Sequence, residues 1–211
     1  RLCGFYASSR TEKYVGIDPR VENHPIYKRQ AEHYERMTNN FWENEKTSEF
    51  ICEAAEDFYY DGYEDTFDTI FTSPPYFNVE KYSHDDTQSW VRYKDIDSWN
   101  SSFLHKALDN MLPTLRSGGK LCINISDVYA NAKWSTSRCW QKICDPMNEF
   151  LDEYGDMEYK GCIGMEMARR PNSGGAGTAK DTKQFKESTL DLVEKTKGIR
   201  FCEPIWIWEK K

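Results

Sequence analysis

The stretch Thr69-Ile70-Phe71-Thr72-Ser73-Pro74-Pro75-Tyr76 joins a short apolar run to a small polar residue, two prolines and an aromatic. Proline has no N–H donor and its φ is fixed, so a strand that reaches Pro74 ends there and the backbone beyond it is rigid. Ligands of open α/β sheets bind at the carboxyl ends of strands. The pattern therefore predicts that Ser73 and the carbonyl groups beside it face a ligand.

The tetrapeptide Ser73-Pro74-Pro75-Tyr76 resembles the catalytic motif of S-adenosylmethionine (SAM)-dependent amino-methyltransferases, in which Asp, Asn or Ser precedes two prolines and an aromatic residue. The exocyclic amine of a base is a poor nucleophile because its lone pair is delocalised into the ring. The resemblance implies that the Ser73 hydroxyl oxygen and the Pro74 carbonyl accept its two N–H bonds and localise that lone pair. It also implies that Tyr76 stacks on a base taken out of its helix. Read alone, the tetrapeptide is a proline-rich turn with a buried tyrosine.

An acid follows an earlier predicted strand. Residues 13–17 read as a short buried strand, and Asp18-Pro19 come directly after it. In nucleotide-binding βαβ units, an acid at this position hydrogen-bonds ribose hydroxyl groups. The resemblance implies that Asp18 binds the ribose of SAM and that Pro19 lies against the adenine. Read alone, Asp18 is more typical of a helix N-cap.

A further strand is predicted near residues 48–53, and it ends among acidic residues. In the methyltransferase pattern, this strand end contacts the adenine amine. The alignment is ambiguous by one residue, so the resemblance leaves four cofactor-binding candidates: Glu53, Ala54, Glu56 and Asp57.

The predicted elements follow one another in the order of the methyltransferase fold, ending with Gly118-Gly119 before a strand at 120–126. The resemblance implies an α/β, Rossmann-like class I methyltransferase fold. Its sheet is mostly parallel and seven-stranded, with an antiparallel pair at the C-terminal edge. We expect residues 1–211 to form a single SAM-dependent methyltransferase domain.

Hydrophobic periodicity and turn residues predict the individual elements. Strands are predicted at 13–17, 48–53, 67–72, 120–126, 157–168 and 199–208. Helices are predicted at 1–8, 22–38, 98–116, 138–153 and, as a short piece, 183–195.

The first strand of the fold and its glycine-rich SAM loop precede the ribose-binding acid by about 20 residues. The printed chain instead begins with what reads as the helix after that loop. We therefore expect that the first strand is missing from the printed sequence. Gly174-Gly175-Ala176-Gly177 does not replace the loop, because no strand–helix pattern surrounds it.

Composition excludes several classes of protein. No apolar run is long enough to span a membrane, and no signal peptide is present. The 7 cysteines include no CxxC pair, which indicates a reducing compartment, no disulfide framework and no metal site. We expect a cytoplasmic protein, in the host cytoplasm if it is encoded by a virus or phage.

The net charge of −7 counts against a nucleic-acid-binding protein, which usually carries a basic face. The basic candidates for binding nevertheless lie in two segments, the aromatic-rich 77–97 and the Gly-rich 169–197, which are candidate target-recognition elements. Ordinary solvated loops are the alternative interpretation. The nucleic-acid-binding candidates are Phe77, Lys81, Tyr82, Arg92, Lys94, Arg169 and Arg170.

The resemblance implies methylation of DNA, as in restriction–modification. In the family that the motif resembles, serine at the first position occurs more with cytosine N4 than with adenine N6, so the resemblance favours cytosine N4. RNA bases and protein amides remain alternative substrates, and the sequence does not indicate the oligomeric state. A different class of function is a non-catalytic methyltransferase-like subunit that binds nucleic acid or a partner. The missing SAM loop and the acidic balance favour this second hypothesis, and the intact Ser73–Tyr76 motif and Asp18 speak against it.

Replacing Arg169 and Arg170 together by alanine tests the second basic segment. Phosphate contacts position a nucleic acid without reading its sequence, so the double variant should bind all sequences more weakly and by a similar factor. The slope of log affinity against log salt should also become shallower, as measured by fluorescence anisotropy between about 50 and about 200 mM salt. An unchanged slope would contradict a phosphate-binding role.

Overall fold

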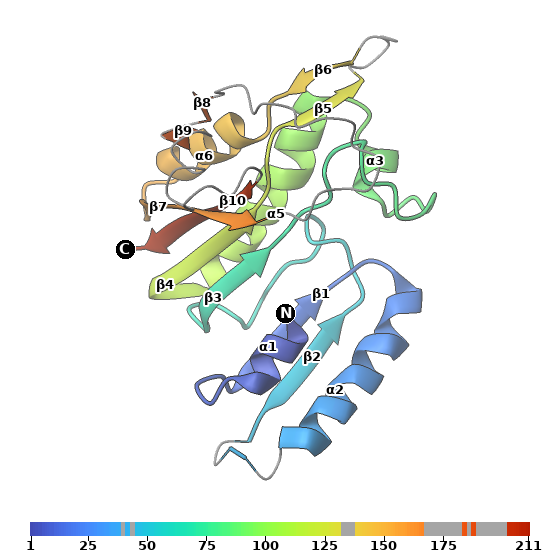
Figure 1. Cartoon of the computed structure of the whole chain (residues 1–211), viewed down its shortest axis with the longest axis vertical. Coiled ribbons are helices and arrows are strands. Elements are labelled where there is room, and N and C mark those ends of the chain that lie inside the picture. Colours follow the sequence, from blue (N-terminus) through green and yellow to red (C-terminus); the bar gives the residue numbers. More distant parts are fainter. Residues whose placement is uncertain (39–40, 43–44, 132–137, 167–182, 185–186, 189–201) are drawn as a thin grey trace.

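The computed structural model describes residues 1–38, 41–42, 45–131, 138–166, 183–184, 187–188 and 202–211 (Figure 1). The chain has an α/β fold with two main sheets. Strands β1 (Lys13–Ile17) and β2 (Thr47–Ile51) form a parallel pair. The larger sheet has the order β3-β4-β10-β7, with β3 (Phe67–Thr72), β4 (Leu115–Asn124), β10 (Cys202–Lys210) and β7 (Met157–Glu166).

Helices and two small hairpins complete the described structure. The helical elements are α1 (Leu2–Ala7), η1 (Val21–Asn23), α2 (His24–Thr38), α3 (Ser89–Arg92), α4 (Ile96–Ser98), the π-helical η2 (Trp99–His105), α5 (Lys106–Met111), η3 (Leu112–Thr114) and α6 (Cys144–Glu153). The hairpins are β5 (Val128–Asn131) with β6 (Arg138–Gln141), and β8 (Lys183–Gln184) with β9 (Glu187–Ser188). Within the ranges given above, no helix combines the length and the apolar character that a bilayer span requires.

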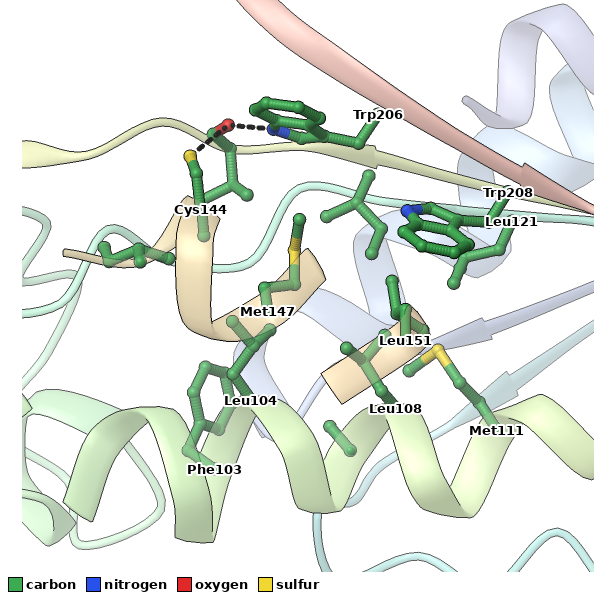
Figure 2. Close-up of a cluster of buried hydrophobic side chains, with 14 of the residues drawn as sticks. Phe103, Leu104, Leu108, Met111, Leu121, Cys144, Met147, Leu151, Trp206 and Trp208 are labelled. Atoms are coloured by element: carbon green, nitrogen blue, oxygen red, sulfur yellow. Dashed lines mark hydrogen bonds between the residues drawn. The ribbon is translucent and has the colours of Figure 1, made fainter. Parts of the chain in front are cut away.

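The larger sheet carries the main hydrophobic core. Figure 2 shows side chains of the helical segment 99–111 and of α6 meeting the buried residues of β4 and β10. Trp206 and Trp208 are fully buried and both indole N–H groups donate hydrogen bonds, to the Ile125 carbonyl and to Asn148 Oδ1, each at 3.0 Å. Burial of these two large rings therefore leaves neither donor unsatisfied.

A smaller core lies between the β1–β2 pair and the first two helices. Leu2, Phe5 and Tyr6 of α1 and Ala31 of α2 are buried together, and Phe50 packs against them. Most of α2 is exposed, so few of its side chains contribute to this core.

The two sheets do not pair with each other. In the described part of the chain, β1 bonds only to β2 and β3 only to β4, so each of these strands has one edge without a neighbour. Arg1 lies near this region, with its guanidinium 5.3 Å from the ring centroid of Phe71 on β3. The described residues thus supply six main strands in two sheets, instead of one continuous seven-stranded sheet.

The structure confirms the α/β class and the antiparallel C-terminal pairing. Strand β10 runs antiparallel to both β4 and β7, and the pairs β1–β2 and β3–β4 are parallel. The strands predicted at 13–17 and 67–72 have the predicted bounds, and the one predicted at 48–53 lies at 47–51.

Three local predictions are wrong. Residues 138–141 form strand β6, and helix α6 begins only at Cys144. Trp140 matched the helical spacing of the residues after it, but pairing with β5 decided the conformation there. Residues 183–184 and 187–188 pair as strands, where a short helix was predicted, and the predicted loop 77–97 contains helix α3.

The Gly118-Gly119 pair marks a shift of register instead of the end of the preceding helix. Helical structure ends at Thr114. On β3, Phe67 pairs with Leu115, but Thr69, only two residues later, pairs with Lys120. Gly118 has a φ of +76°, a conformation that residues with a side chain rarely adopt. The extra residues therefore bulge out before β4 pairs regularly.

Substitution of Gly119 by alanine should lower the free energy of unfolding by about 1–3 kcal/mol. A Cβ atom there would lie 2.7 Å from the Arg116 carbonyl oxygen, which is backbone and cannot move away freely. The matched control is Gly4→Ala in helix α1, where no atom lies within 4 Å. The control should raise stability slightly, because alanine is the better helix former. Urea unfolding measures both, and equal effects would contradict the argument.

Candidate functional site

The carboxyl ends of β1 and β2 bring Asp18 and Pro19 close to the residues after β2. The Asp18 N–H donates to the Ile51 carbonyl at 3.1 Å, and Cys52 Sγ lies 4.0 Å from the Pro19 carbonyl oxygen. Parallel pairing of the two strands places both strand ends at the same edge. The structure therefore brings Asp18, Pro19 and the start of the 52–57 segment together.

The Asp18 carboxylate is held by donors from its own chain. Its Oδ1 accepts the Arg20 N–H at 2.8 Å, and its Oδ2 accepts Asn23 Nδ2 at 2.9 Å and the Tyr27 hydroxyl at 2.5 Å. Burial, together with this bond, raises the pKa of Tyr27 to about 12, so Tyr27 is the proton donor. A carboxylate has about four acceptor positions, of which these bonds use three. One acceptor position therefore remains for a ligand hydroxyl group.

The four candidates after β2 fall into two pairs. Glu53 is exposed, and Ala54 is buried, with its carbonyl accepting the N–H groups of Asp57 and Phe58 at 3.0 and 3.1 Å. Glu56 and Asp57 instead bind Arg92 of helix α3, whose Nη1 lies 2.7 Å from an oxygen of each. Glu53 and Ala54 directly follow Cys52, which approaches Pro19, whereas Glu56 and Asp57 are engaged by Arg92.

Glu56 is a buried carboxylate with its side chain 3% exposed. Arg92 and, at 3.3 Å, the Tyr93 hydroxyl donate to its Oε1, while Asn110 Nδ2 donates to its backbone carbonyl at 2.9 Å. Burial raises the pKa of Glu56 above its ordinary value, and the Arg92 charge opposes that rise. This network joins the segment after β2 to helices α3 and α5.

The Ser73-Pro74-Pro75-Tyr76 motif begins directly after β3, as predicted. The register pairs Thr72 with Ile123, so Ser73 lies beside Asn124 at the end of β4. Ser73 is half-buried, Pro74 is buried, and the Tyr76 N–H donates to Glu80 Oε2 at 3.1 Å. The motif is thus a fixed turn with a partly accessible serine at its start.

Phe77 locks the chain after the motif into the core. Its φ is +33°, which is uncommon for a residue with a side chain. The ring is only 1% exposed and meets Trp99 edge-on, with centroids 6.2 Å apart. A nucleic acid could not reach this ring in the present arrangement, so its placement differs from the predicted binding role. Burial of the ring keeps a strained backbone in place.

The Tyr76 hydroxyl is buried at the junction of β3, β4 and β10. It lies beside Ser126 and Glu203, and both burial and the Glu203 carboxylate raise its pKa. Among the described residues, no partner meets hydrogen-bond geometry with this hydroxyl. Ser126 and Glu203 nevertheless act on the pKa of this hydroxyl as hydrogen-bonding neighbours, so the hydroxyl is buried among polar groups.

The 77–97 segment gathers two predicted cations around one indole. Lys81 Nζ and Lys94 Nζ lie 4.8 and 5.6 Å from the Trp90 ring centroid, and Trp90 Nε1 donates to the Ser83 carbonyl at 2.9 Å. Tyr82 is exposed and donates to Glu80 Oε2 at 2.8 Å. Lys81, Tyr82 and Lys94 are therefore accessible, whereas the Arg92 charge is committed to Glu56 and Asp57.

Two of the predicted residues, Arg169 and Arg170, and most of the 169–197 segment lie outside the described residues. Within the part of the chain that is described, no three His, Cys, Asp or Glu side chains come together in a way that could hold a metal ion.

Sequence reasoning missed several residues around the site. Tyr27 and Asn23 bond Asp18, and Ser126 and Glu203 flank Tyr76. Tyr27 follows Asp18 by nine residues, on a helix that was predicted, so its approach to the carboxylate could have been suspected. Nothing near Glu203 in the sequence indicates its neighbour, because strand order alone brings it there.

The chain belongs to the DNA methylase family. The sequence model of this family matches residues 67–190, which is more than half of the chain and includes the Ser73–Tyr76 motif. No curated protein matches the chain in a sequence search.

Solved structures with similar folds are distant in sequence. A candidate DNA modification methylase from Thermus thermophilus, complexed with S-adenosyl-L-methionine, is 15% identical with a TM-score of 0.44. The match covers 75% of this chain and 53% of that protein, so the chain spans about half of its length. A SAM-dependent methyltransferase from Methanosarcina mazei is 12% identical with a TM-score of 0.48, covering 96% of this chain and 84% of that one.

Replacing Arg92 by alanine should destabilise the fold by about 2 kcal/mol near pH 7, because buried Glu56 loses its cation. This is less than for a fully buried pair, because Arg92 is partly exposed. The folded-state pKa of Glu56, already raised by burial, should rise further. The folded state then binds a proton more readily than the unfolded chain, so the deficit should shrink as the pH falls.

Urea unfolding between pH 5 and pH 8 measures this dependence. Adding Glu56→Gln to Arg92→Ala removes the uncompensated charge and should recover part of the lost stability. If Arg92→Ala lost the same free energy of unfolding at every pH, Arg92 would not be the cation that stabilises the Glu56 carboxylate.

Proposed function

We propose that this protein transfers a methyl group from SAM to an exocyclic amine of a base in DNA. The observation that carries the proposal is the Ser73-Pro74-Pro75-Tyr76 turn at the carboxyl end of β3, in a chain of the DNA methylase family. The turn starts from a parallel strand, where ligands of α/β sheets bind.

The proposed roles follow from the acceptors that this turn offers. The Ser73 hydroxyl oxygen and the Pro74 carbonyl accept the two N–H bonds of the target amine, so its lone pair points at the methyl group. When bound, SAM supplies that electrophilic methyl group on a sulfonium, whose carbon–sulfur bond breaks as the nitrogen–carbon bond forms. Tyr76 stacks on the extruded base. The methylated ammonium loses a proton to water, so no strong general base is required.

The cofactor side of the proposal uses the ends of β1 and β2. Asp18 offers one open acceptor position to a ribose hydroxyl. When Tyr27 or Asn23 releases Asp18 Oδ2 and donates to the other ribose oxygen instead, a second acceptor position of the carboxylate becomes available. Pro19 and Ala54 supply apolar surface for the adenine, and Glu53 supplies an acceptor for its amine. Glu56 and Asp57 support this segment from behind through Arg92.

Cytosine N4 is the proposed target in preference to adenine N6. Serine stands first in the motif, and the family pattern associates serine more with cytosine N4 and aspartate more with adenine N6. Target recognition is assigned to segments 77–97 and 169–197, which lie in one proposed domain with the catalytic turn.

A second candidate is a non-catalytic subunit that binds nucleic acid or a partner. The donors that already occupy most of the Asp18 carboxylate favour it, as does the net charge of −7. SAM binding separates the two candidates, because only the enzyme requires it.

Ser73→Ala in the full-length natural protein should lower the methylation rate at least about 100-fold, as expected when one preorganised transition-state contact is lost. SAM affinity measured by calorimetry should stay unchanged, because Ser73 faces the base. Mass analysis of nucleosides from duplex DNA measures the rate and identifies the methylated base. The matched control is Ser102→Ala, an exposed serine of helix η2. No SAM binding by the wild-type protein would support the non-catalytic subunit.

A further inference from the structure

The β5–β6 hairpin exposes a pair of large aromatic rings. Tyr129 and Trp140 are directly opposite in the antiparallel register, with ring centroids 5.7 Å apart. They are 49% and 57% exposed, whereas the neighbouring pair Val128 and Gln141 is buried. Successive side chains of a strand point to opposite faces. One face of the hairpin is therefore buried against the core, and the face with the aromatic rings is exposed to solvent. Grouped exposed aromatics, unlike single ones, indicate a binding surface.

The base of this hairpin is held firmly. Asp127 Oδ1 accepts the N–H groups of Ile143 and Cys144 at 2.8 and 3.0 Å, which ties the start of β5 to the start of α6. Asn100 Nδ2, from the π-helical segment η2, donates to the Lys142 carbonyl at 2.9 Å. Both strands thus leave the core at defined positions, and a rigid arm loses little conformational freedom on binding.

The hairpin begins next to the catalytic turn. Only Ile125, Ser126 and Asp127 separate the end of β4 from β5, and Ser126 lies beside the Tyr76 hydroxyl. Figure 1 shows the hairpin beyond the arrowheads of β3 and β4, at the end of the sheet where Ser73 lies. The arm therefore leaves the sheet at the end where the Ser73–Tyr76 turn begins.

The composition of the arm complements a nucleic acid. Residues 128–144 contain Lys133, Arg138 and Lys142 and no acid, in a chain whose net charge is −7. The Lys142 ammonium is paired with Asp127 and Asp145 at 3.2 and 3.3 Å, so Lys133 and Arg138 supply the net positive charge of the arm. This local positive charge attracts a polyanion. Exposed aromatic rings can stack on the flat faces of bases. A two-stranded β-ribbon is also narrow enough to enter the major groove of DNA.

From these observations we infer that the β5–β6 hairpin is a DNA-contacting arm, in which Tyr129 and Trp140 contact nucleotides that flank the methylated base. This inference rests on the proposed function. It adds a target-contacting element to the two segments that sequence reasoning indicated.

Trp140→Ala and Tyr129→Ala test the inference in the full-length protein. Each should weaken binding of a fluorescent target duplex at least about fivefold, the range found when one stacking aromatic is removed. SAM affinity should not change. Trp140→Phe keeps a stacking ring and should bind within about twofold of the wild type. Phe41→Ala removes an exposed aromatic before the amino end of β2 and should have no effect.

Photo-crosslinking provides an independent measurement that does not depend on affinity. Duplex DNA with 5-iodouracil beside the target base should crosslink to peptides that contain Tyr129 or Trp140, as identified by mass spectrometry. Wild-type binding by both alanine variants, or crosslinks only elsewhere, would overturn the inference while leaving the proposed function intact. A wild-type protein that binds no duplex would overturn both.

Discussion

The antiparallel insertion of β10 between β4 and β7 is the constraint on which the rest of the larger sheet depends. It buries Trp206 and Trp208 completely, and their two indole N–H groups bond the Ile125 carbonyl and Asn148. The bond to Ile125 fixes the chain where it leaves β4, directly before Ser126. Long-range pairing by strand β10 therefore shapes both the surroundings of the Ser73–Tyr76 turn and the start of the β5–β6 hairpin.

The Ser73–Tyr76 turn, to which we assign the proposed catalysis, gains its rigidity from several local contacts. Two prolines end β3, and the Tyr76 N–H bonds Glu80. Phe77 adopts a positive φ that its burial against Trp99 stabilises. Strain of this kind persists only where the surrounding contacts determine the conformation. The acceptors proposed for the amine are consequently in place before any base arrives, which is what electrostatic preorganisation requires.

The site also shows how tertiary contacts divide residues that look alike in the sequence. Glu53 and Glu56 lie three residues apart with the same side chain, but one is exposed and the other is buried against Arg92. Arg92 and Lys94 are both basic, but their described contacts differ. Arg92 forms ion pairs with Glu56 and Asp57, whereas Lys94 lies over the Trp90 ring. The carboxylate cluster determines this difference, and no local pattern reveals which acid will be buried.

Local sequence was sufficient for the β3 strand and its Pro-Pro stop, for the acid after β1, and for the order of elements, because φ restriction and apolar runs act over a few residues. It could not predict β6, where Trp140 fits a helical pattern and pairs with Tyr129 instead. It could not place Glu203 beside Tyr76 either, since residues 127 positions apart meet only through strand order. Pairing and burial are non-local interactions, so the tertiary structure alone decides which side chains surround the motif that the sequence defines.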